Sequence, residues 1–541
     1  MVGGSGGPGG GRGGDTILNI FNGESLPWCL TWYSTIISIA PLASDLFRPY
    51  LVVNALYNSA EREAEHAVTC QPETRTKVLQ NIRSWADSTT ATPMCWLSGP
   101  AGTGKTTVAH TIAEEYDKHR RLAATFFFWR TTGDRDDINR VVTTLAWQLA
   151  ANIPIVKKRM EEALQLNNDS WALFPHLSLE EQLSKLFVGG GPAAKVEPAD
   201  PNLIVIDGLD ECASQDRIVR LINWLRKNRH PFRILLTSRP EPNIKACIAS
   251  RQDDRPIDVL SLSLTESKDD IRKYFVKEVE KIKRSHSESR RLSDWPPNSD
   301  IDKLVDQSEG LFAYAALAVR YIGGHGYPKT LLKNVLKVQV GLDALYSQVI
   351  KEASKWSNFD IVMGSLMHLR YSLPIESFSN IVFIVNGQPL EAGDISSALG
   401  GCHSILAIPD DDFETITPYH ASLRDFLLDQ SRSKGLIYTP AMSHAHLMLG
   451  CLRAITRAFN EGSQAPEYAV ISWHHHACLL LSTPGTHEEL GGLKDEAVEL
   501  IQKIDVKWIK SWMTEALCWA GAEYLTVGLP LQKVTESARC L

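Results

Sequence analysis

The sequence has no Cys-x-x-Cys pair among its ten cysteines, which argues against a zinc or disulfide framework. Scattered thiols are typical of a reducing compartment, so we expect a cytoplasmic protein. A secretory signal is also lacking, because nine of the first fourteen residues are glycine. Such a segment cannot bury a core, and residues 1–15 are predicted to be disordered. The net charge of −7 argues against general nucleic-acid binding, and no nucleic-acid partner is expected.

The chain has one uncharged stretch of membrane-spanning length, from Ser25 to Ser44. Pro27 and Pro41 argue against a continuous spanning helix. A buried or partner-binding helix is therefore the favoured interpretation. Membrane contact by residues 25–44 and an irregular apolar segment remain open.

A glycine-rich loop fits the phosphate-binding pattern G-x-x-x-x-G-K-[ST]. An apolar strand at 94–97 precedes it and a helical pattern at 108–113 follows, which is the context that the motif requires. The glycines let backbone N–H groups turn towards phosphate oxygens, and the helix N-terminus adds positive charge. We expect Lys105 to reach the β- and γ-phosphates and Thr106 to ligate Mg²⁺. A glycine-rich turn without a ligand is the alternative. The candidate nucleotide-binding residues are Gly99, Pro100, Ala101, Gly102, Thr103, Gly104, Lys105, Thr106 and Thr107.

A turn at 69–75 and a helix at 77–86 lead into this loop, within a region from Asn54 to Thr90 that has a helical composition. Residues at this place in nucleotide-binding proteins often contact the base or the ribose. Thr74 and Arg75 are therefore candidate nucleotide contacts, and a plain linker helix is the alternative.

A second landmark is the apolar run Leu203–Ile206, which ends in Asp207. Ligand chemistry in parallel sheets lies at the carboxyl ends of strands. We expect Asp207 to hold Mg²⁺, partly through water. Glu211, together with Asp210, is a candidate for orienting or deprotonating the attacking water. A cluster at a helix N-terminus is the alternative.

Residues 232–238 predict a further strand, with Arg239 at its tip. A guanidinium there is a candidate γ-phosphate sensor, and a structural ion pair is the alternative. Strands are also predicted at 122–129 and 257–262, and helices at 138–150 and from a capping box at Ser267–Asp270. Alternating strands and helices over 94–280 predict an α/β P-loop NTPase with a parallel sheet and flanking helices.

The strand signal fades after Asp300. Short helices and two β-like pieces, 404–409 and 414–418, suggest a winged-helix-like module, with helical segments before and after it. The run Trp473–His476 is weak evidence for metal, because adjacent histidines on a helix point in different directions. The predicted divisions are 1–15 disordered, 16–69 apolar and helical, 70–280 NTPase, 281–350 helical, 351–435 winged-helix-like and 436–541 helical.

These motifs together resemble the NACHT domain of STAND signal-transduction ATPases, closest to the large fungal group with a nephrocystin-3-like N-terminal domain. The resemblance rests on residues 99–107, 203–211 and 236–239. It extends to Cys70-x-x-x-Thr74-Arg75, to 144–149 and 310–315, and to the run 419–427, which is similar to an "H-x-S-F-x-D-F-L" motif. No internal repeat period appears, so the C-terminal repeat array usual in the family is not expected.

The resemblance implies a molecular switch that holds ADP in a closed form and opens and oligomerises when ATP replaces it. His420 is the position that would contact the β-phosphate, and a hydrogen-bonded core histidine is the alternative. We therefore expect an ATP/ADP-binding switch of innate-immunity or incompatibility type, with Mg²⁺, slow ATP hydrolysis and homo-oligomerisation on activation. The alternative is a non-hydrolysing scaffold for protein–protein interaction. A GTPase is disfavoured because no N-K-x-D signature occurs.

Overall fold

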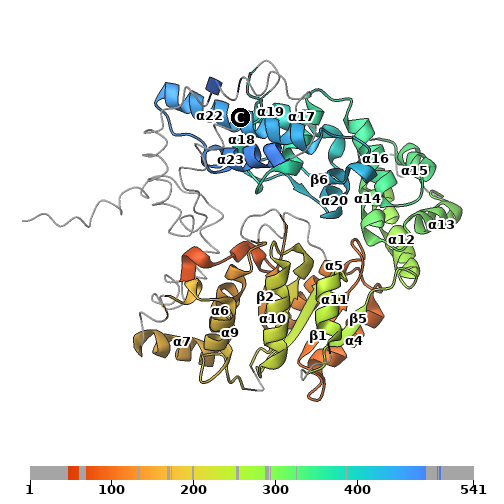
Figure 1. Ribbon diagram of the computed structural model, residues 1–541. Coiled ribbons are helices and arrows are strands. Elements are labelled where there is room, and N and C mark those ends of the chain that lie inside the picture. The colour runs from red at the N-terminus through yellow and green to blue at the C-terminus, as the bar shows by residue number, and fades with distance from the viewer. Residues whose placement is uncertain are drawn as a thin grey trace, which may run out of the picture.

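The computed structural model describes residues 47–59, 69–130, 135–166, 171, 173–197, 200–250, 255–286, 292, 294–324, 326–383, 387–482, 496, 499 and 500. Figure 1 shows a lobe that contains the parallel sheet and a second, helical lobe facing it, with α12 and α14–α16 joining the two at one side. The predictions for residues 1–15, for most of 16–69 and for the end of the C-terminal segment lie outside the described residues. No helix in the described ranges is long and apolar enough to cross a membrane.

The sheet of the first lobe contains, in the part of the chain described, five parallel strands in the order β2-β3-β4-β1-β5. Strands β1 and β3 are buried along their whole length, as expected for a parallel sheet covered on both faces. The predicted strands and the predicted fold class are confirmed. The strand bounds are β1 Met94–Ser98, β2 Leu122–Phe127, β3 Leu203–Asp207, β4 Arg233–Ser238 and β5 Asp258–Ser261.

Side chains that alternate along β1, β3 and β4 contribute to two separate cores. Met94 and Trp96 of β1 belong to one core, whereas Cys95 and Leu97 belong to the other. Helices α4 and α5 contribute to the second core, and α6, α9, α10 and α11 contribute to the first. The bounds are α4 Thr76–Asp87, α5 Lys105–Lys118, α6 Asn139–Asn152, α7 Pro154–Leu166, α9 Leu179–Phe187, α10 Gln215–Lys227 and α11 Pro242–Ala249, with 3-10 turns η1 Arg48–Tyr50, η2 Val53–Ala55, η3 Phe174–His176 and η4 Leu209–Glu211.

A single hydrophobic core runs from Ile271 to Leu480 through the rest of the described chain. Its helices are α12 Lys268–Ser285, α13 Asn298–Gln307, α14 Phe312–Ile322, α15 Pro328–Lys337, α16 Leu342–Ala353, α17 Phe359–His368, α18 Ile375–Ser379, α19 Ala392–Ala398, α20 Ser422–Leu428, α21 Gln430–Ser433, α22 Pro440–Glu461 and α23 Glu467–Ser482, with a 3-10 turn η6 Gly400–Cys402. Between η6 and α20, strands β6 Leu406–Ala407 and β7 Thr417–Pro418 pair as an antiparallel hairpin. The two β-like pieces in the sequence thus form short strands.

Two local predictions are wrong. The predicted capping box at Ser267 does not form, because Ser267 is itself in the right-handed helical region and its hydroxyl donates to the carbonyl of Ser263. Its expected partner Asp270 instead accepts the backbone N–H of Arg75. The helical start expected at Asn54 is only the 3-10 turn η2. There the chain turns to the sheet, and the Tyr57 N–H donates to the hydroxyl of Thr125 on β2.

Candidate functional site

The glycine loop joins the buried strand β1 to helix α5, as its motif predicts. Gly104 lies in the left-handed region with φ 89° and precedes Lys105, the first residue of α5. Gly102 has φ 78° and passes so close to α14 that an added Cβ would lie 2.9 Å from the Cβ of Ala313. The Lys105 ammonium donates to the carbonyls of Gly99 and Pro100, each at 2.9 Å. Glycine is therefore required where the loop turns and where it is covered.

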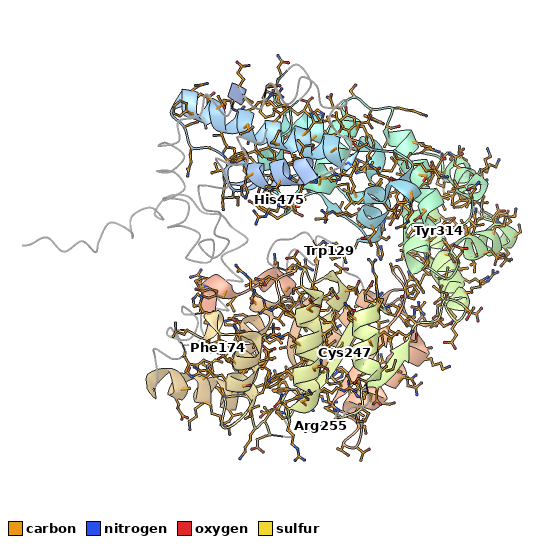
Figure 2. All side chains as sticks on the ribbon, in the orientation of Figure 1. Trp129, Phe174, Cys247, Arg255, Tyr314 and His475 are labelled. Carbon is orange, nitrogen blue, oxygen red and sulfur yellow. The ribbon has the colours of Figure 1, made fainter. Side chains whose placement is uncertain are left out.

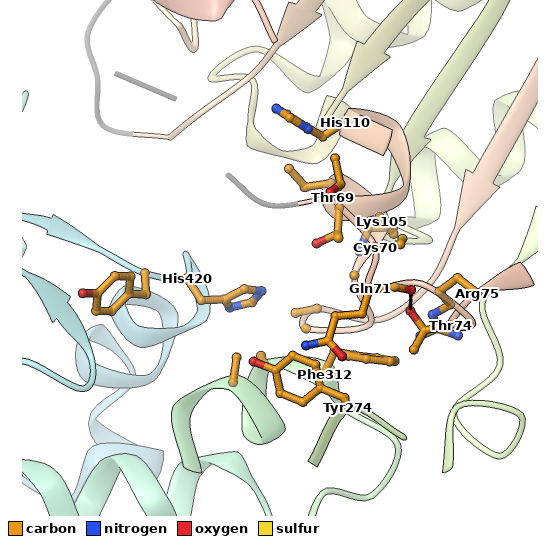
Figure 3. A pocket seen from close by; sticks show the side chains of 18 of the residues that line it. Thr69, Cys70, Gln71, Thr74, Arg75, Lys105, His110, Tyr274, Phe312 and His420 are labelled. Carbon is orange, nitrogen blue, oxygen red and sulfur yellow. Dashed lines mark hydrogen bonds between the residues drawn. The ribbon is translucent and has the colours of Figure 1, made fainter. Parts of the chain in front are cut away.

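The loop forms one wall of a cavity of about 580 Å³ (Figure 3). Segments from both lobes line this cavity, including the turn before α4, the tips of β3 and β4, helices α12 and α14, and the loop 419–421. The loop residues that line it are Ala101, Gly102, Gly104, Lys105, Thr106 and Thr107. Gly99, Pro100 and Thr103 lie behind them, and the hydroxyl of Thr103 donates to the Pro100 carbonyl. These three residues shape the loop and do not line the cavity.

Asp207 lies at the tip of β3 and is almost fully buried, at 2% exposure. One of its carboxylate oxygens accepts the hydroxyl of Thr237 on β4, and the Thr237 hydroxyl in turn accepts the N–H of Gly208. Asp207 is not among the residues that line the cavity, whereas Thr106 and Thr237 are. A hydroxyl and a carboxylate are hard oxygen donors, the ligand type that Mg²⁺ prefers.

Two acidic side chains follow Asp207 and have different partners. Asp210 pairs with Arg239, with 3.0 Å between its Oδ2 and Nε of the arginine, and its other oxygen accepts the Arg239 N–H. The Glu211 carboxylate accepts the backbone N–H of Arg130 at 3.1 Å. Burial, with the neighbouring Asp210 charge, raises the pKa of Glu211 to about 7. Arg239 therefore forms an ion pair, the arrangement considered as its alternative, and the pKa of Glu211 lies near neutral pH.

The segment before α4 is fixed against the glycine loop. Thr74 and Arg75 both line the cavity. The Thr74 hydroxyl donates to the Gln71 carbonyl, which closes the turn. The Arg75 guanidinium donates to the carbonyl of Thr103 at 2.6 Å and lies 4.8 Å from the centroid of the Phe312 ring. The structure thus places both predicted residues at the site, with Arg75 supporting the loop.

His420 enters the cavity from the helical lobe, and Figure 3 shows its ring pointing towards the side on which Lys105 lies. Its Nδ1 accepts the Ser422 N–H at 3.1 Å, so the neutral ring carries its proton on Nε2. Burial lowers the pKa of His420 to about 4, and the charges of Lys105 and Arg239 act in the same direction. The ring is therefore neutral at physiological pH and offers one N–H donor.

Several residues that line the cavity were not predicted from the sequence. Phe312 and Tyr274 form an aromatic wall, with ring centroids 6.0 Å apart, beside Gln71 (Figure 3). Arg320 stacks on Tyr419, with its guanidinium 4.0 Å from the ring centroid. Phe312 and Tyr419 lie inside the two runs that carried the family resemblance, which was a usable signal. Tyr274 lies in an ordinary amphipathic helix, and nothing in its sequence context marks it.

In the run 473–476, Trp473 and His476 are buried, whereas His474 and His475 are partly exposed. Nδ1 of His476 shares a hydrogen bond with Nδ1 of His444 at 3.0 Å, and its Nε2 contacts the Tyr468 hydroxyl at 2.9 Å. Figure 2 shows His475 in the helical lobe. Among the described residues, no group of three or more His, Cys, Asp or Glu side chains is placed to hold a metal ion.

One family model matches the part of the chain that contains this site. Residues 73–239 match the family model described as "Nephrocystin 3, N-terminal". No curated protein matches. Among solved structures, the crystal structure of CDC6P from Pyrobaculum aerophilum aligns at 12% identity over 68% of this chain and 95% of that one, with a TM-score of 0.28. The family match includes the glycine loop and the tips of β3 and β4. The chain therefore carries a NACHT-like P-loop NTPase domain, similar to the nephrocystin-3 N-terminal family over residues 73–239.

Proposed function

We propose that this chain is an ATP- and ADP-binding switch of the STAND type, which hydrolyses ATP slowly and oligomerises under nucleotide control in an innate-immunity- or incompatibility-like response. One observation carries the proposal: the glycine loop and His420, far apart in the sequence and in different lobes, line the same cavity. A nucleotide bound there would contact both lobes. Its identity would therefore bias how the lobes sit together.

The phosphate groups would lie on the glycine loop. The N-terminus of α5 directs backbone N–H groups and partial positive charge to that point. Lys105 is held at the loop by two carbonyls and would exchange these partners for phosphate oxygens. Mg²⁺ bound with the nucleotide would be held by the Thr106 hydroxyl and, partly through water, by Asp207. Its chemical contribution when bound is to neutralise charge on the phosphates.

For hydrolysis, Glu211 is the residue best suited to accept a proton from the attacking water. A pKa near 7 keeps a large fraction of its carboxyl ionised and still basic at physiological pH. The Arg130 N–H fixes one carboxylate oxygen. Arg239 would stabilise charge on the transferring phosphoryl group, with Asp210 holding the guanidinium in place.

The base would occupy the end of the cavity formed by Gln71, Tyr274 and Phe312, where aromatic rings offer a stacking surface. His420 would donate its Nε2 proton to a β-phosphate oxygen. This contact links the helices and hairpin at 351–435, which we interpret as a winged-helix-like module, to the nucleotide. We also propose the domain boundaries given above, with the winged-helix-like module at 351–435.

The proposal is tested by measuring ADP and ATP affinity and molar mass in solution with each nucleotide. We expect micromolar or tighter binding and a larger assembly with ATP than with ADP. Lys105→Ala should abolish binding, whereas Lys118→Ala, on the exposed end of the same helix, should leave it unchanged. A Lys105→Ala protein that binds like the wild type would overturn the site. A mass that is the same with either nucleotide would overturn the switch.

A further inference from the structure

Arg239 at the tip of β4 is shared between two carboxylates from different lobes. Its Nε lies 3.0 Å from Oδ2 of Asp210 in the NTPase lobe. Its Nη1 lies 2.7 Å from Oδ2 of Asp425 on α20 in the helical lobe. The three side chains are partly or fully buried, with exposures of 21% for Arg239, 24% for Asp425 and 4% for Asp210. Ion pairs at such sites are screened less by solvent than surface pairs.

Arg130, just after β2, approaches the same aspartate. Its Nη1 lies 3.4 Å from Oδ1 of Asp425, and its Nη2 donates to the backbone carbonyl of Asp210 at 2.8 Å. Its backbone N–H holds Glu211. One carboxylate of the helical lobe therefore engages both arginines that support the acidic residues after β3.

This network lies directly beside the nucleotide cavity. Asp210, Glu211 and Arg239 line the large cavity. A second, water-sized cavity of about 20 Å³ adjoins it and is lined by Glu211, Arg239 and Asp425, among others. Asp425 thus lines only the smaller cavity, and Arg239, which lines both, lies between Asp425 and the large one.

The charges of these residues bear on which nucleotide, diphosphate or triphosphate, the arrangement favours. A γ-phosphate adds negative charge where Asp210 and Glu211 already lie, and Arg239 is the guanidinium placed to offset it. In the structure described, the charge of Arg239 is already satisfied by Asp210 and Asp425. A γ-phosphate would therefore compete with Asp425 for Arg239, whereas a diphosphate lacks the group that would compete.

We propose that Asp425 determines the selectivity of this conformation for nucleoside diphosphate over triphosphate, by pairing with Arg239 and withholding it from a γ-phosphate. Asp425 acts here as a positioning residue, since it does not line the nucleotide cavity. The inference rests on the proposed function, because it assumes that the large cavity holds an adenine nucleotide. It assigns the selectivity to a residue of the run 419–427, outside the phosphate-binding loop and the strand tips.

The test is the ratio of the ATP and ADP dissociation constants, measured on the full chain by titration calorimetry with hydrolysis prevented by omission of Mg²⁺. Asp425→Asn keeps the shape of the side chain and removes its charge. We expect the ratio to shift towards ATP by about tenfold, the typical size of a lost charge-assisted contact of about 1.5 kcal/mol. Asp425→Glu should retain most of the wild-type ratio. Asp425→Ser is a second variant without the charge.

A matched control is available nearby. Asp343 on α16 pairs with Arg432 through two contacts of 2.9 and 2.7 Å, and both side chains are exposed. Asp343→Asn removes one negative charge and one ion pair from the same lobe without contacting Arg239. The ratio of the ATP and ADP dissociation constants of Asp343→Asn should equal that of the wild type.

The outcomes separate the two claims. If the wild type binds neither nucleotide, the proposed function fails. If the wild type binds both, and Asp425→Asn and Asp425→Ser leave the ratio unchanged, only the role of Asp425 is overturned. An equal shift in Asp343→Asn would also overturn that role, because it would show an effect of net charge alone.

Discussion

The guanidinium of Arg75 donates to the carbonyl oxygen of Thr103 at 2.6 Å, which joins the segment before the first strand to the middle of the phosphate loop. The same guanidinium lies over the ring of Phe312 at the start of α14. Arg75 itself adopts a left-handed backbone with φ 54°, and its N–H is held by Asp270. Three segments that are distant in the sequence thus meet at one side chain, and the geometry of the loop depends on it.

Arg75→Ala is expected to weaken nucleotide binding by roughly tenfold, because a buried charge-assisted hydrogen bond contributes about 1.5–3 kcal/mol. The loop carbonyl would lose its donor, and Phe312 would lose its cation–π partner. Fluorescent ADP titration measures the change. Arg83→Ala is the control, since Arg83 pairs with Glu115 on the outside of the same region and does not line the cavity. Equal affinities for both variants would contradict the supporting role of Arg75.

Glu211 gives a pH dependence of known sign. Because its pKa is raised to about 7, the carboxyl is protonated below that pH and cannot accept a proton from water. Steady-state ATP hydrolysis should therefore rise as the pH increases from about 6 to 8. Glu211→Gln should bind nucleotide as the wild type does but lower the hydrolysis rate by about 100-fold, the scale of a lost general base. A variant that turns over at the wild-type rate would remove Glu211 from the reaction.

Unlike Glu211, His420 should give no pH dependence in this range. Its pKa of about 4 keeps the ring neutral from pH 5.5 to 8, so its contribution to ADP binding should be constant there. His420→Ala should weaken ADP binding by about tenfold through loss of one hydrogen bond to a charged phosphate. His403→Ala, a substitution of a histidine that does not line the cavity, provides the comparison. ADP affinity that falls as the wild-type protein is titrated from pH 6 to 7.5 would require a charged His420 and contradict this assignment.

Gly102 should be less tolerant of substitution than another glycine with the same backbone. Gly102→Ala meets both a left-handed backbone and the Cβ of Ala313 at 2.9 Å, whereas Gly435, with φ 74°, has nothing within 4 Å. Gly435→Ala should cost about 1 kcal/mol of unfolding free energy from its backbone alone, and Gly102→Ala about 1 kcal/mol more than that. Chemical denaturation of the two variants measures the difference. Equal losses of unfolding free energy in the two variants would mean that α14 moves away from the loop without a measurable penalty.

The sheet and the phosphate loop could be predicted from the sequence because short, local residue patterns determine them. Buried parallel strands appear as short apolar runs, and the loop needs glycine at fixed positions. Each predicted strand of the sheet is present, and the hairpin at 406–418 lies where two short apolar pieces occur. The predicted capping box at Ser267 does not form, because the Ser267 hydroxyl donates to the nearby carbonyl of Ser263 and Asp270 accepts the N–H of the distant Arg75.

The residues on the far wall of the cavity were harder to predict from the sequence. Tyr274 and Arg320 line the cavity because α12 and α14 fold back over the loop, and no local pattern encodes that return. The pairing of Arg239 with Asp425 likewise joins a strand tip to a helix of the other lobe. Sequence spacing could suggest Arg239 as a sensor or as an ion-pair partner, but only the tertiary arrangement identifies the partner.

The central claim is that the cavity beside Lys105 holds an adenine nucleotide, and the nucleotide content of the purified protein tests it most directly. The protein is denatured, and the released nucleotides are separated by ion-exchange chromatography, with Lys105→Ala treated in the same way. We predict close to one ADP per chain in the wild type and none in Lys105→Ala. No adenine nucleotide in the wild type, together with no uptake of added ATP, would contradict the account and favour a scaffold whose phosphate loop is vestigial.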